Sequence, residues 1–276
     1  MTNLWHPFPA HKRELPLGHC LPPPEPALAV SETGFDPVAF ARLRLGFHPD
    51  PRQESILRST AKRGILNCSR QWGKSMVGAA MAVIRAHTRP SSLVLVAAPT
   101  ERQSGELVRT AESMVHNMGL DPKGDGTNKI SIAFDNGSRI VGLPGHLTGN
   151  AGGIRGFAVS LLLVDEAAYL NDDVYHALTP MLGATDGDLW LMSTPNGKRG
   201  FFYETWAFGT GWEKVKGLAK DCPRIRPEFL ERQRENMGAV RFEQDFLCEF
   251  TESEDATFSQ LLIDRAADST IKPLDL

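Results

Sequence analysis

The sequence predicts an α/β fold in which a largely parallel central sheet is flanked by helices, with a small helical lid subdomain near the C-terminus. Short apolar runs alternate with helical patterns over residues 64–195, which is typical of a parallel sheet covered on both faces. The loop GKS at 73–75 stands between the first of these runs and a helix, an arrangement that suits phosphate groups. Residues 227–250 show only a helical pattern, interrupted at Gly238.

Composition and charge restrict the class of protein. The chain has 276 residues, of which 41% are hydrophobic and 23% charged, so it is long enough to bury a core without covalent staples. The formal net charge of −3 gives no overall basic signature, although a local basic patch can still bind DNA. No apolar run approaches the roughly 20 residues that span a bilayer, and no signal peptide is visible. The cysteines lack metal-ligand spacing and predict reduced thiols in a cytosolic protein: Cys20, Cys68, Cys222 and Cys248.

The N-terminal part of the chain has the composition of an irregular segment. The run LPPPEPA at 21–27 cannot form a helix or a central strand. We expect residues 1–34 to be a flexible Pro-rich arm, and the alternative is a tail that docks on a partner subunit. The core is expected over 35–210, and it begins with a short helix at 36–47 for which Asp36 is the cap.

Within the core, apolar runs predict buried strands, and amphipathic runs of good helix formers predict helices. A β-hairpin is predicted where two short strand patterns flank Asp135-Asn136-Gly137, which contains a favoured turn dipeptide. In chain order we expect a strand at 64–68, a helix at 74–87, a strand at 91–99, a helix at 101–119, the hairpin at 131–143, and strands at 160–166 and 188–195. The later helical pattern predicts the lid subdomain over 211–260 and a linker over 261–276.

The stretch CSRQWGKS at 68–75 follows a strand and precedes a helix, as a phosphate-binding loop does. Gly73 would let the backbone approach the phosphates, Lys74 would neutralise the β and γ phosphates, and Ser75 would supply a hydroxyl to Mg²⁺. The loop therefore predicts a P-loop NTPase with a Walker A motif. The residues expected to contact the nucleotide here are Ser69, Arg70, Gln71, Trp72, Gly73, Lys74 and Ser75.

A second motif, LLLVDEA at 161–167, ends a buried strand with two acids about 90 residues beyond the loop. Asp165 would hold the water shell of Mg²⁺, and Glu166 would orient or deprotonate the attacking water. Taken alone, a strand-end Asp-Glu pair is also explained by a helix cap followed by a solvated acid. Together with the phosphate loop it predicts an ASCE-type ATPase with a Walker B motif.

Three further polar residues complete the predicted site. Ser193 and Thr194 end another buried strand, where they would sense the γ phosphate or the lytic water and couple hydrolysis to movement. The alternative is an ordinary strand-ending turn. Gln53, in FHPDPRQ at 47–53, has an amide that matches the two-sided edge of adenine, and the alternative is a surface glutamine.

The set PxPxQ, SRQxGKS, LLLVDEA and STP resembles the ATPase domain of the terminase large subunit of tailed bacteriophages, the motor that drives viral DNA into the procapsid. An arginine inside the loop is characteristic of that family, whose loops often lack the first glycine, where this chain has Cys68. The resemblance runs from about residue 45 to about 260 and includes a lid-like segment at 229–250. It implies ATP and Mg²⁺ as cofactors.

The resemblance also implies roles for two arginines. Arg70 would touch the γ phosphate within its own chain and join Lys74 and Glu166 as a catalytic residue. Arg155, in GGIRGF, would act as an arginine finger on the ATP of a neighbouring subunit, because a guanidinium stabilises charge on the transferring phosphoryl group. The alternative for Arg155 is a surface arginine on a flexible loop.

The partners implied by the resemblance are double-stranded DNA, the portal protein and the small terminase subunit. It implies a homo-oligomeric ring of about five subunits on the procapsid, monomers in isolation, and a location in the host cytoplasm without a membrane. The segment NGKRGFF at 196–202 is the favoured place for coupling phosphate loss to motion. The family's full subunit carries a nuclease domain after the ATPase, and this chain ends at Leu276, so we expect no DNA cleavage by it.

Other functions fit the residues less well. A helicase, or a single-core fragment of a helicase-like DNA translocase, shares the glutamine and the Asp-Glu pair, but a complete helicase needs two cores and the sequence has one phosphate loop. A small-molecule kinase has no use for a catalytic glutamate at Glu166. A non-catalytic assembly module that only binds nucleotide stays open until hydrolysis is measured.

Overall fold

The computed structural model describes residues 34–144 and 158–252, and the elements named below lie in the unit that begins at Asp36. These residues contain a seven-stranded sheet with the order β3-β4-β2-β5-β6-β1-β7. Every neighbouring pair in this sheet is parallel except β3 and β4. The strands are β1 Arg63–Cys68, β2 Leu93–Ala98, β3 Ser131–Ala133, β4 Arg139–Pro144, β5 Leu161–Asp165, β6 Asp188–Ser193 and β7 Glu213–Gly217.

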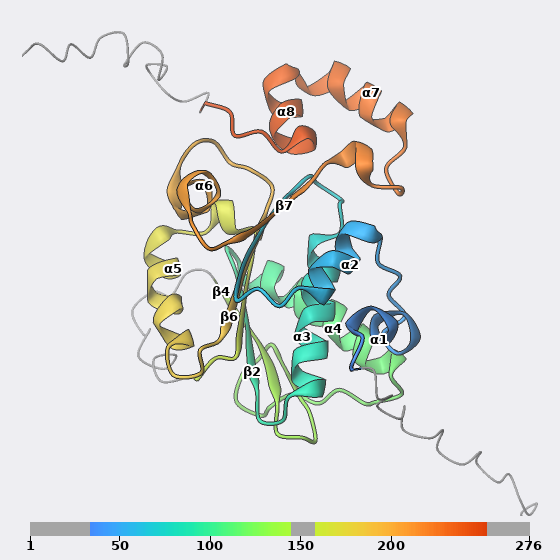
Figure 1. Cartoon of the computed structure of the whole chain (residues 1–276), viewed down its shortest axis with the longest axis vertical. Coiled ribbons are helices and arrows are strands. Elements are labelled where there is room, and N and C mark those ends of the chain that lie inside the picture. The colour runs from blue at the N-terminus through green and yellow to red at the C-terminus, as the bar shows by residue number, and fades with distance from the viewer. Residues whose placement is uncertain (1–33, 145–157, 253–276) are drawn as a thin grey trace, which may run out of the picture. The chain divides into compact units, whose positions relative to one another are not determined.

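Helices cover both faces of the sheet (Figure 1). On one face α1 to α4 share a core cluster with the α7–α8 pair, and on the other face α5 and α6 form a second cluster. The helices are α1 Pro37–Leu43, α2 Pro51–Arg58, α3 Lys74–Thr88, α4 Glu101–Asn117, α5 Asp172–Leu178, α6 Gly200–Phe208, α7 Pro227–Met237 and α8 Ala239–Leu247. Because both faces are covered, central strands such as β2 are buried along their whole length, which explains their uniformly apolar sequences.

Side-chain caps fix where several helices begin. Asp36 caps α1, Thr100 caps α4, and Asp50 caps α2 in a capping box with Gln53. The helix α3 is different, because it begins directly after Gly73, whose φ of 101° is in the left-handed region. No side chain among the described residues caps α3, so the N–H groups of its first turn face the loop in front of it.

The largely parallel α/β sheet predicted from the sequence is confirmed, including the antiparallel hairpin of β3 and β4. The segment expected as the lid starts with β7, which pairs in parallel with β1 at the edge of the sheet. Only after β7 does the chain form α7 and α8, which lie beside each other (Figure 1). None of the described helices is long and apolar enough to cross a membrane. The expected arm and linker fall mainly outside the described residues.

Candidate nucleotide-binding site

Three parallel strands bring the predicted motifs to one edge of the sheet. The order β5-β6-β1 makes these strands neighbours, so their carboxyl ends lie next to one another. Asp165 is the last residue of β5, Ser193 is the last residue of β6, and Cys68 is the last residue of β1. Ligands of open α/β sheets bind outside the carboxyl ends of the strands, so this edge is where a nucleotide site is expected.

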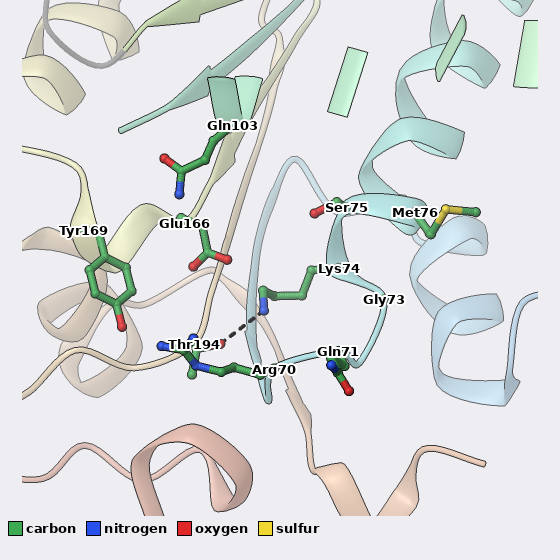
Figure 2. A pocket seen from close by; sticks show the side chains of 10 residues that line it. All are labelled: Arg70, Gln71, Gly73, Lys74, Ser75, Met76, Gln103, Glu166, Tyr169 and Thr194. Atoms are coloured by element: carbon green, nitrogen blue, oxygen red, sulfur yellow. Dashed lines mark hydrogen bonds between the residues drawn. The ribbon is translucent and has the colours of Figure 1, made fainter. Parts of the chain in front are cut away.

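A cavity of about 600 Å³ lies at this edge (Figure 2). Its walls come from the phosphate loop and the start of α3, from the ends of β5 and β6, and from α4. The lining residues are Arg70, Gln71, Gly73, Lys74, Ser75, Met76, Gln103, Glu166, Tyr169 and Thr194. The volume lies within the range of small-molecule sites, and the lining combines cationic, acidic and hydroxyl groups.

Two side chains of the loop before α3, those of Ser69 and Trp72, are buried and do not line the cavity. Gln71 has a φ of 60° and Gly73 a φ of 101°, which gives the tight turn before the helix. The Trp72 side chain is 1% exposed and belongs to the core cluster under the loop. Ser69 is also fully buried, and its N–H donates to the Gly217 carbonyl. The loop is therefore held from below by core packing.

The Lys74 amine is held in a fixed position at the cavity. It donates to the Thr194 hydroxyl at 3.1 Å and to the Ser69 carbonyl at 3.3 Å. Thr194 in turn donates to the Cys68 carbonyl at 3.0 Å, so one hydroxyl joins the end of β6 to the phosphate loop. Figure 2 shows Lys74 and Glu166 pointing toward the same space. A cation and a carboxylate thus face a common volume.

Ser75 and Asp165 form an oxygen-rich pair next to the loop. The Ser75 hydroxyl donates to Asp165 Oδ2 at 2.9 Å, and Asp165 is 4% exposed. Burial raises the pKa of the Asp165 carboxyl and the charge of Glu166 raises it further, while Lys74 and Ser75 oppose the shift. A hydroxyl facing a buried carboxylate is a donor set that fits Mg²⁺. The part of the chain that the structure describes contains no group of three or more His, Cys, Asp or Glu that could hold a metal ion by itself.

Glu166 has an unusual backbone that aims its side chain. Its φ of 49° and ψ of 43° are left-handed, which costs a non-glycine residue about 1 kcal/mol. Its N–H donates to Asp165 Oδ1 at 3.1 Å, so the two acids are oriented together. The next residues form the short 3₁₀ helix η2, Ala167–Tyr169. The result is a partly exposed carboxylate at the cavity wall, beside a buried one.

Ser193 connects two of the motifs through the backbone. Its hydroxyl accepts from the Ala168 N–H at 3.1 Å and donates to the Thr194 carbonyl at 2.8 Å. Ala168 follows Glu166 by two residues, so the end of β6 and the segment after the catalytic glutamate candidate are linked. Asn196 adds a longer contact to the Ala168 carbonyl at 3.4 Å.

Arg70 lies between the loop and α8. Its Nε is 3.0 Å from Asp245 Oδ2, and its backbone N–H donates to the Asp245 carbonyl at 3.1 Å. Asp245 is 2% exposed, whereas the Arg70 side chain is 55% exposed and also lines the cavity. Burial raises the pKa of the Tyr169 hydroxyl, and the nearby Arg70 charge opposes that shift. Arg70 thus contacts α8 in this structure, while its exposed guanidinium faces the cavity.

The remaining predicted residues lie elsewhere. Gln53 is fully buried and does not line the cavity; its Oε1 accepts from the Asp50 N–H at 3.0 Å, and its Nε2 donates to the Trp72 carbonyl at 3.2 Å. Its adenine contact therefore stays a prediction that this geometry does not support. Arg155 lies outside the described residues. The sequence reasoning missed Gln103 and Tyr169, and the signal for Gln103 was its position just beyond the buried strand at 91–99.

The chain is similar to known proteins over most of its length. A family model described as "Terminase large subunit, T4likevirus-type, N-terminal" matches residues 65–265. Terminase large subunits from Thermus virus P23-45 and Thermus phage G20c are each 26% identical over 251 residues, which covers 79% of this chain and 52% of theirs. The chain therefore spans about half the length of these curated relatives.

Solved structures show the same fold. The large terminase ATPase domain of Thermus phage P74-26 has a TM-score of 0.65 and 25% identity, over 77% of this chain and 98% of that one. The HK97 bacteriophage large terminase has a TM-score of 0.64 and 14% identity, over 78% of this chain and 54% of that one. A large terminase from a thermophilic bacteriophage, solved in complex with ADP, has a TM-score of 0.61 at 15% identity, over 74% and 54%. The family match spans most of the chain, and we conclude that the chain belongs to the terminase large subunit family of the T4likevirus type and corresponds to its N-terminal ATPase domain.

Proposed function

We propose that this chain is the ATP-hydrolysing motor domain of a phage terminase large subunit and that it powers the movement of double-stranded DNA into a procapsid. The observation that carries the proposal is the convergence of Lys74, Ser75, Glu166 and Thr194 on one cavity, with Asp165 next to Ser75. Family membership supports the same reaction.

In this proposal the triphosphate lies against the phosphate loop and the N-terminus of α3. Backbone N–H groups and the positive end of the helix dipole favour phosphate there. Lys74 and Arg70 add positive charge from two sides of the cavity. The large terminase of the thermophilic bacteriophage, which shares the fold, has been solved with ADP and with ATP-γ-S. These observations support ATP as the nucleotide.

The reaction follows from the groups around the triphosphate. Glu166 orients a water molecule in line with the γ phosphorus and accepts its proton. The water oxygen bonds to phosphorus, the bond to the β–γ bridging oxygen breaks, and ADP leaves. Lys74 and Arg70 stabilise charge on the phosphoryl oxygens. Ser75 and Asp165 would hold Mg²⁺, which when bound neutralises charge shared by the β and γ phosphates.

Phosphate loss has a physical route into the rest of the domain. Thr194 contacts Lys74. Three residues further along the chain, the Gly197 N–H donates to Gln244 Oε1 at 3.3 Å. Gln244 and the neighbouring Asp245 are both on α8, which therefore contacts the segment after β6 and the phosphate loop. These contacts support Thr194 as a coupling residue of the motor. The hydrogen bonds of the Ser193 hydroxyl with the Ala168 N–H and the Thr194 carbonyl support the same role for Ser193.

The partners are part of the same proposal. A terminase large subunit implies DNA-packaging partners, and we propose double-stranded DNA, a portal protein and a small terminase subunit. We also propose that the working form is a ring of subunits in the host cytoplasm, with Arg155 acting on a neighbour's ATP.

Phosphate release by the 276-residue chain tests the proposed function. Glu166→Gln should lower steady-state ATP turnover by at least about 100-fold, because the carboxylate that accepts the proton is lost. ATP binding, followed by calorimetry, should persist, because the loop and Lys74 are unchanged. The matched control is Glu112→Gln, a partly exposed glutamate on α4 away from the cavity, which should hydrolyse ATP like the wild type. Full activity in Glu166→Gln would contradict the proposal.

A further inference from the structure

One carbonyl of the phosphate loop accepts two side-chain hydrogen bonds from outside the loop. The Trp72 carbonyl accepts from Gln53 Nε2 at 3.2 Å and from a terminal guanidinium nitrogen of Arg224 at 2.6 Å. Gln53 comes from α2, and Arg224 comes from the connection between β7 and α7. Both donors therefore fix the same peptide unit from segments far apart in the sequence.

The residue after this carbonyl has to be glycine for both donors to approach. A Cβ on Gly73 would lie 2.8 Å from Gln53 Nε2 and 3.2 Å from the same Arg224 nitrogen. The first distance is shorter than real contacts allow, so a side chain there would displace the glutamine amide. The glycine thus makes room on the outer side of the loop in addition to allowing its left-handed turn.

Both donors are themselves held in place. Asp50 Oδ1 accepts from the Gln53 N–H at 3.0 Å as the cap of α2. Asp50 Oδ2 is buried and accepts no hydrogen bond from the residues that the structure describes. It lies 3.7 Å from the Arg224 guanidinium, so it acts on the arginine through its charge. On either side of Arg224, Cys222 and Ile225 are buried in the core cluster, which fixes the backbone that carries the arginine.

We propose that Arg224, together with Gln53, is a positioning residue that sets the 72–73 peptide plane for phosphate binding. The C=O and N–H of one trans peptide point in opposite directions. Holding the Trp72 carbonyl outward therefore aims the Gly73 N–H toward the cavity that Gly73 lines. The ligand served is the triphosphate of any nucleotide, not the adenine base. This inference rests on the proposed function, because it concerns how the same site holds phosphate.

The test compares binding of ATP with binding of inorganic tripolyphosphate, which has no base. Arg224→Ala should weaken both by the same factor, about tenfold, because a half-exposed charge-assisted hydrogen bond is lost. KM for ATP should rise while kcat changes less than about twofold, since loop geometry serves ground and transition states alike. Arg224→Lys, which keeps the charge and a donor, should recover part of the affinity.

Arg52 offers a matched control, because it also joins α2 to the connection between β7 and α7. It donates to Asp221 Oδ2 at 2.9 Å and to the Lys216 carbonyl, and its side chain is 48% exposed against 49% for Arg224. Arg52→Ala removes a tether between α2 and the β7–α7 connection without touching the loop carbonyl. It should leave both affinities near wild type, and the Gly73 amide ¹⁵N resonance should move in Arg224→Ala but not in Arg52→Ala.

Several results would overturn the inference. A loss of ATP affinity with unchanged tripolyphosphate affinity would assign Arg224 to the base. Equal losses of affinity in Arg224→Ala and Arg52→Ala would show that Arg224 only holds α2 and the β7–α7 connection together. Wild-type affinity in Arg224→Ala would remove its role while leaving the proposed function intact. If the wild-type chain bound neither ATP nor tripolyphosphate, the proposed function itself would fail, and the inference with it.

Discussion

At the scale of single residues, the Thr194 hydroxyl joins Lys74 to the end of β1. It accepts from Lys74 and donates to the Cys68 carbonyl, so it positions the amine that would meet the phosphates. Thr194 is 2% exposed, and these bonds are therefore made away from bulk water. Loss of the hydroxyl would leave a buried carbonyl unsatisfied and a buried amine with one fewer partner.

Thr194→Val is therefore expected to lower ATP turnover by roughly tenfold or more, because small displacements of a catalytic group cost rate steeply. The free energy of unfolding should fall by about 1–3 kcal/mol from the unsatisfied carbonyl. Urea denaturation and phosphate release measure the two effects. Thr194→Ser keeps the hydroxyl and should retain most of both properties. Normal turnover in the valine variant would show that Lys74 does not depend on this contact.

Gln53 shows what residue-level reasoning from sequence can and cannot decide. An amide near a phosphate loop has the chemistry to read adenine, and the sequence places it correctly near the loop. The spacing Asp50-x-x-Gln53 is also a capping-box pattern, which the structure contains. Adenine recognition and helix capping are therefore both compatible with the sequence around Gln53. The choice depends on where α2 lies relative to the loop, and only the tertiary structure gives that.

At the scale of elements, the loop between α4 and β3 is built around one carboxylate. The Asp125 side chain is 1% exposed and accepts from the N–H groups of Thr127 and Asn128, and from the Ser131 hydroxyl. Arg139 on β4 lies 3.4 Å from it. Burial acts to raise the pKa of Asp125, but the hydrogen bonds, led by those from Asn128, outweigh it and lower the pKa to about 2.

This lowered pKa predicts a pH-dependent contribution to stability. The folded chain holds the proton less tightly than the unfolded chain, whose carboxyl has the ordinary pKa of 3.8. The stabilisation, about 2 kcal/mol, is therefore present above pH 4 and is lost as the pH falls toward 2. Asp125→Asn should be less stable at pH 7 by about that amount, and the difference should shrink in acid. Asp135→Asn, in an exposed turn, is the control, and equal stability of both variants at pH 7 would refute the role of Asp125.

The strands differ in how well sequence could predict them, and burial explains the difference. The residues of β2 are all buried, so they form a continuous apolar run that predicts a strand. β7, with the sequence EKVKG, is mostly half-buried at the sheet edge, and no apolar run marks it. The sequence pattern therefore places its residues in the expected lid subdomain over 211–260. Edge strands carry charges as a rule, which conceals them from this kind of pattern.

At the scale of the whole molecule, the motifs made the fold predictable from the sequence, because each motif lies at the end of a buried strand. The phosphate loop, the Asp-Glu pair and the Ser-Thr pair follow β1, β5 and β6, which the sheet makes neighbours. The sequence did not predict the contacts of Arg224 or Asp245 with the loop, because long-range contacts of single polar residues leave no local pattern. The assembly of several chains into a ring is a separate question. We propose that Arg155 links neighbouring subunits in this ring by acting on the neighbour's ATP.

A mixing experiment tests that assembly. Glu166→Gln and Arg155→Ala should each be nearly inactive alone, since each lacks one group of the proposed composite site. If Arg155 reaches a neighbouring subunit, an equal mixture recovers sites in which an intact Glu166 meets an intact arginine from the next subunit. Random assembly around a closed ring gives about a quarter of the wild-type sites. Mixing Arg155→Ala with the double variant Arg155→Ala/Glu166→Gln restores no arginine and should give no recovery. Full ATPase activity of Arg155→Ala alone would refute the role of Arg155 as an arginine finger. If both variants are inactive and their mixture forms rings, as seen by light scattering, but regains no ATPase activity, the arginine acts in the site of its own chain.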